Sequence, residues 1–339
     1  MSPPPASPNA IKERMAPLIE RYRDRLPVTD STPVVSLGEG STPLLRAPRA
    51  SERLSVELFV KCEGANPTGS FKDRGMTVAI SKALEEGAHT VICASTGNTA
   101  ASAAAYAARA GLVAVVLQPE RAVASSKIAQ ARAVGARVLE IRGSFDAGLD
   151  AARALAERGT HVLVNSVNPH RVEGQKTAAF EIVEELGRPP DVLALPYGGG
   201  GNTCAYARGF AEAGAGVPRI VAAEAEQRAT TLASAIRITR PVHAEAATEA
   251  IRASGGAVVT LGDDAILAAW RELAHEGLFC EPASAAGLAA LGRVEVARGA
   301  RVVCVLTGHG LKDPSPVAGS GPPPVVVDPD PDAIAEASR

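Results

Sequence analysis

The sequence predicts an α/β fold of two domains, each built on a mostly parallel, twisted sheet flanked by helices. Short runs rich in β-branched residues alternate with longer Ala-rich runs, the pattern of parallel strands joined by crossover helices. Several short runs are apolar along most of their length, as expected of strands covered on both faces. The 339 residues exceed the usual size of a single core, so we expect two domains.

Composition and charge limit the kinds of molecule that the protein is expected to bind. The chain is 46% hydrophobic and 21% charged, which is typical of a soluble globular protein. Its 35 basic and 37 acidic residues nearly cancel, leaving no basic surface for nucleic acid or an anionic membrane. No run approaches the ~18 apolar residues that span a bilayer, and the first residues lack the features of a signal peptide. We therefore expect a cytoplasmic protein that binds a small molecule.

The five cysteines indicate neither a zinc cluster nor a disulfide framework, because they lie far apart and include no CxxC pair. We expect them to be small buried hydrophobic residues in a reducing compartment, and we expect no metal site. They are Cys62, Cys93, Cys204, Cys280 and Cys304.

Local patterns predict the elements along the chain. Residues 1–10, rich in Pro and Ser, are expected to be disordered, and residues 11–26 to form an amphipathic helix. A strand and a turn should follow over 34–43. The Pro-rich stretch 322–331 predicts an extended tail with at most a short helix after it. The remaining predicted strands are 57–61, 91–94, 114–117, 137–141, 161–165, 192–195, 220–223 and 301–306.

The expected domain boundaries follow the alternation of these elements. Residues 11–47 together with 160–318 should form a large domain, residues 48–159 a small domain, and residues 319–339 a C-terminal tail. Ligands of parallel sheets bind beyond the carboxyl ends of the strands. The loops that follow the strands are therefore the places to look for a site, and four of them have unusual residues.

The first loop, residues 66–75, contains Lys72 ahead of a helical run that begins near Met76. Burial and a nearby helix end would lower the pKa of this amine and favour its neutral form. A neutral amine is what a Schiff base requires. Taken alone, the loop is more simply explained by a surface lysine paired with Asp73.

The second loop follows the predicted strand 91–94 and precedes an Ala-rich helix over 100–110. The free N–H groups of the first helical turn, with the hydroxyls of Ser95, Thr96 and Thr99, would suit an anion such as a carboxylate. Ordinary helix N-caps are the simpler alternative.

The third loop has four successive glycines before Asn202 and Thr203, directly after the predicted strand 192–195. Such a run lets the backbone curl so that its N–H groups converge on a phosphate. It does not fit the GxGxxG spacing of dinucleotide-binding folds, and the chain has no Walker A pattern. A flexible loop without a ligand is the alternative. The glycines are Gly198, Gly199, Gly200 and Gly201.

The fourth loop, residues 307–310, ends the predicted strand 301–306. The hydroxyl of Thr307 could form a hydrogen bond with a neutral pyridine nitrogen. On its own, His309 is typical of an ordinary loop histidine.

Taken in order, the four loops resemble those of the fold type II pyridoxal-phosphate (PLP) enzymes, the tryptophan-synthase-β-like family, and within it the threonine synthases. The resemblance runs from about residue 20 to 315. The further stretches that match it are 165–169, 173–180, 281–286 and 310–314.

The resemblance implies a role for each loop toward PLP. Lys72 would hold the cofactor and move protons, and Asn98 would bond its 3′-oxygen. The four glycines and Asn202 would cradle its phosphate, while Thr307 would face the ring nitrogen.

The resemblance also implies how a substrate would bind. Ser95, Thr96 and Thr99 would hold it, and a second group of residues would grip its phosphate. Arginine suits that task because its planar fork pairs with phosphate oxygens. The members of the second group are Asn165, Ser166 and Arg171. The implied activity is conversion of O-phospho-L-homoserine and water to L-threonine and phosphate by a homodimeric lyase.

Three departures from the threonine synthase pattern keep a second interpretation open. Gly199 and Gly200 replace the first Asn and the Ala of the usual Gly-Asn-Ala-Gly-Asn loop, and His309 replaces the Asn of Thr-Gly-Asn-Gly. Residues 118–123 lack the customary Pro-Gln-Gly-Lys. The alternative is a paralogue that performs β/γ-elimination or replacement on another phosphorylated, phosphonate or hydroxy amino acid, including dehydratase-like activity on serine or threonine.

A non-catalytic binding protein is a minor alternative. Lys72 argues against it, because a protein that needs no Schiff base has no chemical reason to hold a lysine there.

Overall fold

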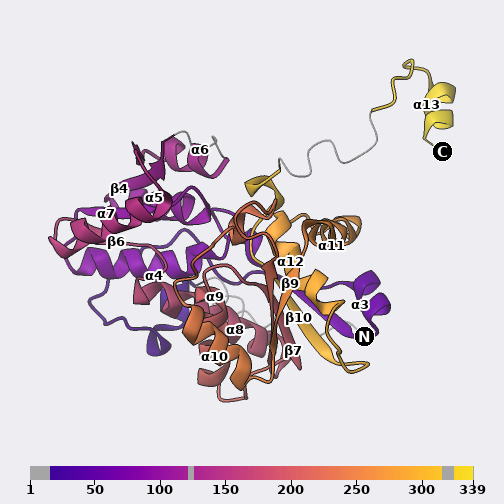
Figure 1. Ribbon diagram of the computed structural model, residues 1–339, viewed down its shortest axis with the longest axis horizontal. Helices are drawn as coiled ribbons and strands as arrows, with labels where there is room; N and C mark the ends of the chain where they lie inside the picture. The colour runs from indigo at the N-terminus through magenta and orange to yellow at the C-terminus, as the bar shows by residue number, and fades with distance from the viewer. Residues whose placement is uncertain (1–15, 121–125, 315–323, 339) are drawn as a thin grey trace.

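The computed structural model describes residues 16–120, 126–314 and 324–338, and these form two sheets flanked by helices (Figure 1). The predicted α/β class is confirmed, since β1–β2 is antiparallel and every other strand pair is parallel. The larger sheet has the order β1 (Leu44–Arg46), β2 (Glu57–Cys62), β10 (Arg301–Leu306), β7 (Val192–Pro196), β8 (Arg219–Ala225) and β9 (Ala257–Leu261). The smaller has the order β5 (Arg137–Ile141), β4 (Val113–Pro119), β3 (Thr90–Ala94) and β6 (Val162–Leu163).

The strand predicted within residues 34–43 is wrong. Val35 there donates its N–H to Ser81 Oγ and accepts a hydrogen bond from Thr77 Oγ1. Because side chains satisfy its backbone, the segment needs no partner strand. The short strand β1 and the edge strand β9 were not predicted; Val258 in β9 is 40% exposed, so that run lacks the continuous apolar character of the central strands.

Two strands belong to a different sheet from the one that the expected domain boundaries imply. β2 falls within the range expected for the small domain, yet it pairs with β10 over six residues in the larger sheet. β6 was expected in the large domain but pairs with β3 in the smaller sheet. We propose that each sheet is the centre of one domain, with the chain crossing between them after β2 and after β6.

Apart from α13 (Pro331–Ala337), the described helices flank the two sheets (Figure 1). Of the helix predicted over 11–26, the described part contains only the short α2 (Leu18–Arg21) and a 3₁₀ turn, η1 (Arg23–Arg25). The disorder expected for residues 1–10 falls outside the described residues. In the described part of the tail, residues 324–330 have no regular structure and α13 (Pro331–Ala337) follows. No described helix is both long and apolar enough to cross a membrane.

The other helices have the following bounds. The α-helices are α3 (Pro48–Leu54), α4 (Lys72–Glu85), α5 (Asn98–Ala110), α6 (Ser126–Ala133), α7 (Phe145–Glu157), α8 (Pro169–Leu186), α9 (Gly201–Glu212), α10 (Ala244–Ala253), α11 (Asp263–His275) and α12 (Pro282–Leu291). The 3₁₀ turns are η2 (Glu63–Ala65), η3 (Ser234–Ile236) and η4 (Gly310–Lys312).

Helices α4 and α8 cross with their backbones in contact. A Cβ atom added to Gly75 on α4 would overlap the Arg171 carbonyl, and one added to Gly174 on α8 would overlap the Arg74 carbonyl. Glycine is therefore required on both helices at the crossing. The close approach brings Lys72, at the start of α4, near Arg171, in the first turn of α8.

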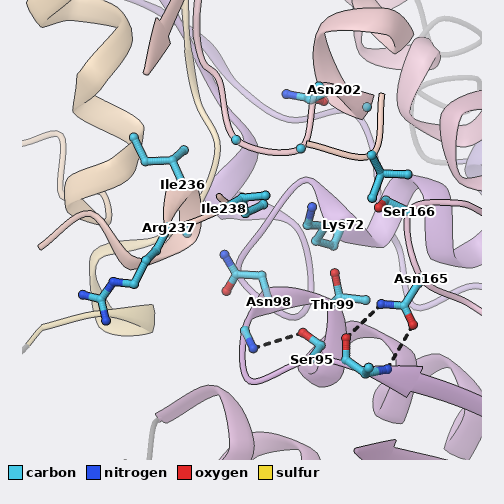
Figure 2. Close-up of a pocket in the computed structure, with 18 of the residues that line it drawn as sticks. Lys72, Ser95, Asn98, Thr99, Asn165, Ser166, Asn202, Ile236, Arg237 and Ile238 are labelled. Atoms are coloured by element: carbon cyan, nitrogen blue, oxygen red, sulfur yellow. Dashed lines mark hydrogen bonds between the residues drawn. The ribbon is translucent and has the colours of Figure 1, made fainter. Parts of the chain in front are cut away.

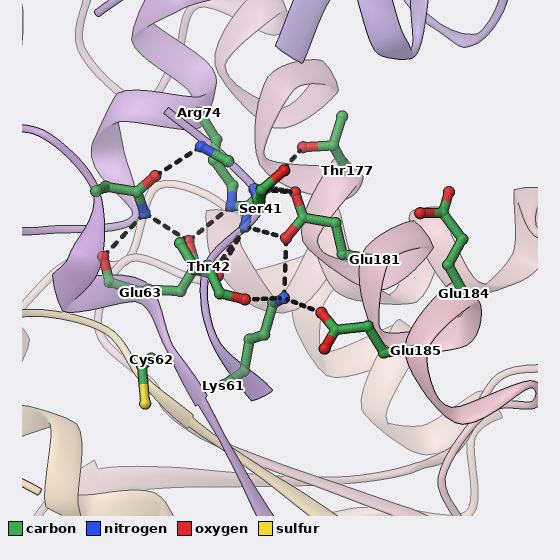
Figure 3. A network of polar contacts seen from close by, with 12 residues as sticks. Ser41, Thr42, Lys61, Cys62, Glu63, Arg74, Thr177, Glu181, Glu184 and Glu185 are labelled. Carbon is green, nitrogen blue, oxygen red and sulfur yellow. Dashed lines mark hydrogen bonds and ion pairs between the residues drawn. The ribbon is translucent and has the colours of Figure 1, made fainter. Parts of the chain in front are cut away.

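A buried network of charges stabilises this crossing (Figure 3). Arg74 is fully buried and makes two bidentate ion pairs, with Glu63 at 2.7–2.8 Å and with Glu181 at 2.7 Å. Lys61, also fully buried, donates to Glu181 Oε2 at 2.8 Å and to the Thr42 carbonyl at 2.7 Å. The network thus joins β2, η2, α4 and α8. Burial alone would raise the pKa of Glu181, but Arg74 and Lys61 hold it well below the usual value.

We expect Glu181→Gln to lower the free energy of unfolding by about 3–5 kcal/mol at pH 7, because it leaves Arg74 and Lys61 buried and underpaired. Since the folded-state pKa of Glu181 is depressed, its contribution is complete above the unfolded-state pKa and is lost as pH falls toward the folded-state value. Urea unfolding between pH 3 and 7 measures both effects. Glu249→Gln, in an exposed pair with Arg252, is the control and should change nothing measurable. Equal stability of Glu181→Gln and the parent protein would contradict this account.

Candidate active site

A cavity of about 580 Å³ lies at the carboxyl ends of the strands, lined by loops that follow β3, β7, β8 and β10. Its size is within the range of small-molecule and cofactor sites. Every site residue predicted from the sequence lines it, although they come from segments up to 235 positions apart (307 − 72). These residues are Lys72, Ser95, Thr96, Asn98, Thr99, Asn165, Ser166, Arg171, Gly198, Gly199, Gly200, Gly201, Asn202 and Thr307.

Lys72 is the first residue of α4, and the turn before it is fastened to the loop after β10. The N–H of Phe71 donates to the Thr307 carbonyl at 3.0 Å, and the N–H of His309 donates to the Gly69 carbonyl at 2.9 Å. The Lys72 ammonium nitrogen lies 4.2 Å from the centroid of the Phe71 ring. Desolvation and the nearby charge of Arg171 lower the pKa of Lys72 to about 7, with Glu281 opposing the shift. A large fraction of this amine is therefore neutral at neutral pH.

The loop after β3 turns directly into α5. Ser95 Oγ accepts the Gly97 N–H at 3.1 Å, and the helix begins at Asn98 (Figure 2). The amide nitrogen of Asn98 donates one hydrogen to Glu281 at 2.9 Å, while its oxygen is buried without a partner. One N–H and the oxygen of this amide are thus left for a ligand. In Figure 2, Lys72 lies between Asn98 and Thr99 on one side and Ser166 and Asn202 on the other.

The glycine loop connects β7 to α9. Gly200 has φ of +84°, a left-handed conformation that favours glycine. Beyond it, Asn202 Nδ2 and Thr203 Oγ1 are buried donors without an acceptor. Unpaired buried donors are costly in a protein interior, so their clustering at a helix start indicates a site for an anion.

The residues predicted to grip a substrate phosphate have different surroundings. Arg171 is 1% exposed, and its Nη1 donates to the Val164 carbonyl at 2.7 Å, but its Nε and Nη2 have no acceptor. In the described part of the chain, none of these nitrogens pairs with a carboxylate. Burial lowers the pKa of Arg171 to about 10, so it remains a cation at neutral pH. Asn165 instead uses both atoms of its amide to bond the Ala94 backbone, at 3.0 and 2.8 Å (Figure 2).

Thr307 and His309 belong to the same loop after β10 but have different surroundings. Thr307 lines the cavity, and its hydroxyl lies 3.0 Å from Ser284 Oγ. His309 is not among the lining residues; its ring packs edge-on against Phe279, and its Nδ1 accepts the Leu311 N–H at 3.2 Å. The substitution at position 309 therefore acts on the packing of a neighbouring turn.

Sequence reasoning missed part of the lining. The segment between β8 and α10 contributes Ile236, Arg237 and Ile238 (Figure 2), and the start of α7 contributes Phe145 and Asp146. The first of these segments could have been found, because it follows the carboxyl end of a central parallel strand. The start of α7 follows β5, the edge strand of the smaller sheet, and its residue types are ordinary for a helix start.

These residues fit PLP. The cavity combines an amine with a lowered pKa, a glycine turn at a helix start, and unpaired buried polar atoms on Asn98, Asn202 and Thr203. An aldehyde, a phosphate and a ring hydroxyl would match these three features.

Comparison with known proteins agrees with this assignment. Residues 35–308 match the family described as pyridoxal-phosphate dependent enzymes, and the chain belongs to that family. The enzyme therefore uses PLP. Two solved structures share the fold: maize serine racemase (TM-score 0.72, 24% identity, 82% of this chain and 91% of the other) and the processed form of threonine deaminase isoform 2 from Solanum lycopersicum (TM-score 0.71, 22% identity, 94% and 91%).

Closer relatives are threonine synthases. The chain is 51% identical over 318 residues to threonine synthase of Halalkalibacterium halodurans, covering 88% of this chain and 90% of that protein. It is 53% identical over 331 residues to threonine synthase of a Synechocystis species, covering 91% and 87%. It is 47% identical over 346 residues to threonine synthase of Mycobacterium tuberculosis, covering 95% and 96%.

The lowered pKa of Lys72 predicts its reactivity. As pH rises through about 7 the ammonium loses its proton, so acetylation of Lys72 by acetic anhydride in cofactor-free enzyme should reach half its maximum rate near that pH. Mass spectrometry of the modified peptide across pH 5–11 measures this. Arg171→Met removes a neighbouring positive charge, so it should move the midpoint to higher pH. A midpoint near 10.4, the usual lysine value, would show that Lys72 is not desolvated.

Proposed function

We propose that this enzyme is a threonine synthase, converting O-phospho-L-homoserine and water to L-threonine and phosphate. The observation that carries the proposal is the buried Arg171 cation, whose Nε and Nη2 have no acceptor, in the same cavity as Lys72. A PLP site needs one phosphate cradle, and the glycine loop supplies it. A second anion site in the same cavity calls for a substrate with its own phosphate. The threonine synthases at 47–53% identity support the same assignment.

Lys72 is the residue that moves protons in this proposal. When bound at Lys72, PLP supplies an electron-withdrawing ring that accepts the negative charge left at the substrate α-carbon. With its pKa lowered to about 7, Lys72 Nζ can both remove a proton and return one at neutral pH. Removal of protons from the α- and β-carbons lets the γ-phosphate leave. The γ-carbon then takes up a proton and becomes the methyl group, water supplies its hydroxyl to the β-carbon, and a proton returns to the α-carbon.

The remaining cofactor contacts are proposed from the position of each group. The N–H groups of the glycine loop, with Asn202, hold the cofactor phosphate. The free N–H of Asn98 bonds the 3′-oxygen, and the Thr307 hydroxyl faces the ring nitrogen. Support comes from the cavity lining and from the unpaired atoms of Asn98 and Asn202.

The substrate lies between two sets of groups in this proposal. Its carboxylate binds at the start of α5, where the first-turn N–H groups meet Ser95, Thr96 and Thr99. Its phosphate binds Arg171 and the Ser166 loop. Asn165 acts indirectly, because both atoms of its amide are used to tie that loop to the end of β3.

One observation favours a second candidate, a paralogue that acts on another phosphorylated, phosphonate or hydroxy amino acid. Gly199 and Gly200 line the cavity without any side chain, where the threonine synthase pattern has an amide. The change at His309 does not favour it, because His309 is not among the residues that line the cavity.

We also propose that the enzyme is a cytoplasmic homodimer. The resemblance to threonine synthases supports the homodimer, and the absence of a membrane-spanning helix among the described residues is compatible with the location.

Lys72→Ala tests the function. We expect it to abolish turnover, because the shortened side chain can neither hold the cofactor nor move protons. Phosphate release and threonine formation from O-phospho-L-homoserine, followed by colorimetry and mass spectrometry, are the measurements. If the parent protein releases no phosphate from this substrate but does from another phospho-amino acid, the paralogue is correct. Full activity of Lys72→Ala would remove Lys72 from the mechanism.

Arg171→Met tests the substrate-phosphate site. Loss of a charge-assisted contact worth about 1.5–3 kcal/mol should raise KM for O-phospho-L-homoserine by roughly ten- to a hundredfold. The rate at which PLP is lost during dialysis, measured by its visible absorption, should change less than about threefold. Arg252→Met is the control, since Arg252 is 74% exposed and pairs only with Glu249 among the described residues. Equal losses of cofactor and substrate binding would place Arg171 in the cofactor site or the fold.

A further inference from the structure

His243 contacts both of the loops assigned to phosphates, although it is not among the cavity-lining residues. It precedes α10 directly, and its backbone N–H donates to the Gly199 carbonyl at 3.0 Å. Its side-chain Nε2 lies 2.8 Å from the carbonyl oxygen of Ser166. A carbonyl can only accept, so Nε2 carries the hydrogen and donates it. One residue thus holds a carbonyl of the glycine loop and a carbonyl of the Ser166 loop.

The consequence follows from the geometry of the peptide bond. In a trans peptide the carbonyl and the next N–H point in opposite directions. Because His243 holds the Gly199 carbonyl, the N–H of Gly200 points away from His243, and the same holds for Val167 after the Ser166 carbonyl. Gly200 and Val167 both line the cavity. Within the described residues, neither N–H donates to a protein acceptor.

The fit of His243 also explains two of the four glycines. A Cβ on Gly201 would come within 3.2 Å of the imidazole Cδ2. A Cβ on Gly200 would lie 2.9 Å from the His243 carbonyl oxygen and 3.0 Å from the Ala247 Cβ. Side chains at positions 200 and 201 would therefore force the His243 segment away from the loop.

We propose that His243 is a positioning residue that aims amide donors of both loops, Gly200 N–H toward the cofactor phosphate and Val167 N–H toward the substrate phosphate. The second half rests on the proposed function, because it takes the Ser166 loop to hold the phosphate of a substrate. His243 acts only through the two loops and touches neither ligand.

Three substitutions of His243 separate its side-chain contact with Ser166 from other effects. A glutamine side chain places its amide nitrogen where Nε2 of histidine lies, whereas an asparagine places it near Nδ1. His243→Gln should therefore keep the bond to Ser166, and His243→Asn should lose it. His243→Ala removes the ring as well. All three keep the backbone N–H that bonds Gly199.

The experiment uses the PLP-loaded enzyme and two readouts for the substrate-phosphate loop. We expect His243→Asn and His243→Ala to raise KM for O-phospho-L-homoserine by roughly tenfold, with kcat changed less than about threefold. Calorimetric titration with inorganic phosphate should show the same loss of affinity. His243→Gln should stay within about threefold of the parent protein in both. His275→Ala, an exposed histidine on α11, is the control.

A third readout follows the cofactor loop without using activity. Since every variant keeps the backbone N–H, loss of the visible PLP absorption during dialysis should proceed within about threefold of the parent rate. Unchanged KM and phosphate affinity in both His243→Asn and His243→Ala would overturn the proposal. Equal losses in all three variants, glutamine included, would also overturn it by indicating a purely structural role. If the parent enzyme does not use O-phospho-L-homoserine but the phosphate titrations still follow this pattern, the proposed function fails and the role of His243 stands.

Discussion

The contact between the backbones of α4 and α8 is the constraint on which the site depends. It exists because Gly75 and Gly174 have no Cβ, and any other residue there would overlap the facing carbonyl. Arg74, one position before Gly75, pairs with Glu63 and Glu181 from two other elements. These ion pairs fix the position of α4 on α8. Lys72 lies two residues before Arg74, so the same ion pairs determine where its amine enters the cavity.

The buried charged residues form two groups, one that stabilises the helix crossing and one that lines the cavity. Around Arg74 and Lys61, every buried cation has carboxylate partners, so this network is satisfied without a ligand. In the cavity the opposite holds: the pKa of Lys72 is lowered to about 7, so about half of this amine is neutral at pH 7. Arg171 is a buried cation without a carboxylate partner in the described chain. A buried charge of this kind is costly unless an anion binds. The energetics therefore favour an anionic substrate in addition to the cofactor.

The departures from the threonine synthase pattern differ in whether they lie in the cavity. His309 packs against Phe279 and caps a short turn, whereas Gly199 and Gly200 line the cavity. The loop that lost a side chain is supported from behind by His243. Because His243 holds its backbone, this loop can keep its amide donors in place without a side chain at position 199.

The sequence by itself determined the alternation of strands and helices, the central strands and the cavity residues that follow β3, β7 and β10. Periodicity and loop motifs are local, and these motifs sit at strand ends. It failed for residues 34–37, where both backbone groups of Val35 bond side chains on α4, and for β2 and β6, whose sheets depend on partners far along the chain. Only the tertiary structure decided that Asn165 ties a loop, that Arg171 has no counterion and that His243 reaches Ser166. Each of these is a contact between distant segments, which no local pattern encodes.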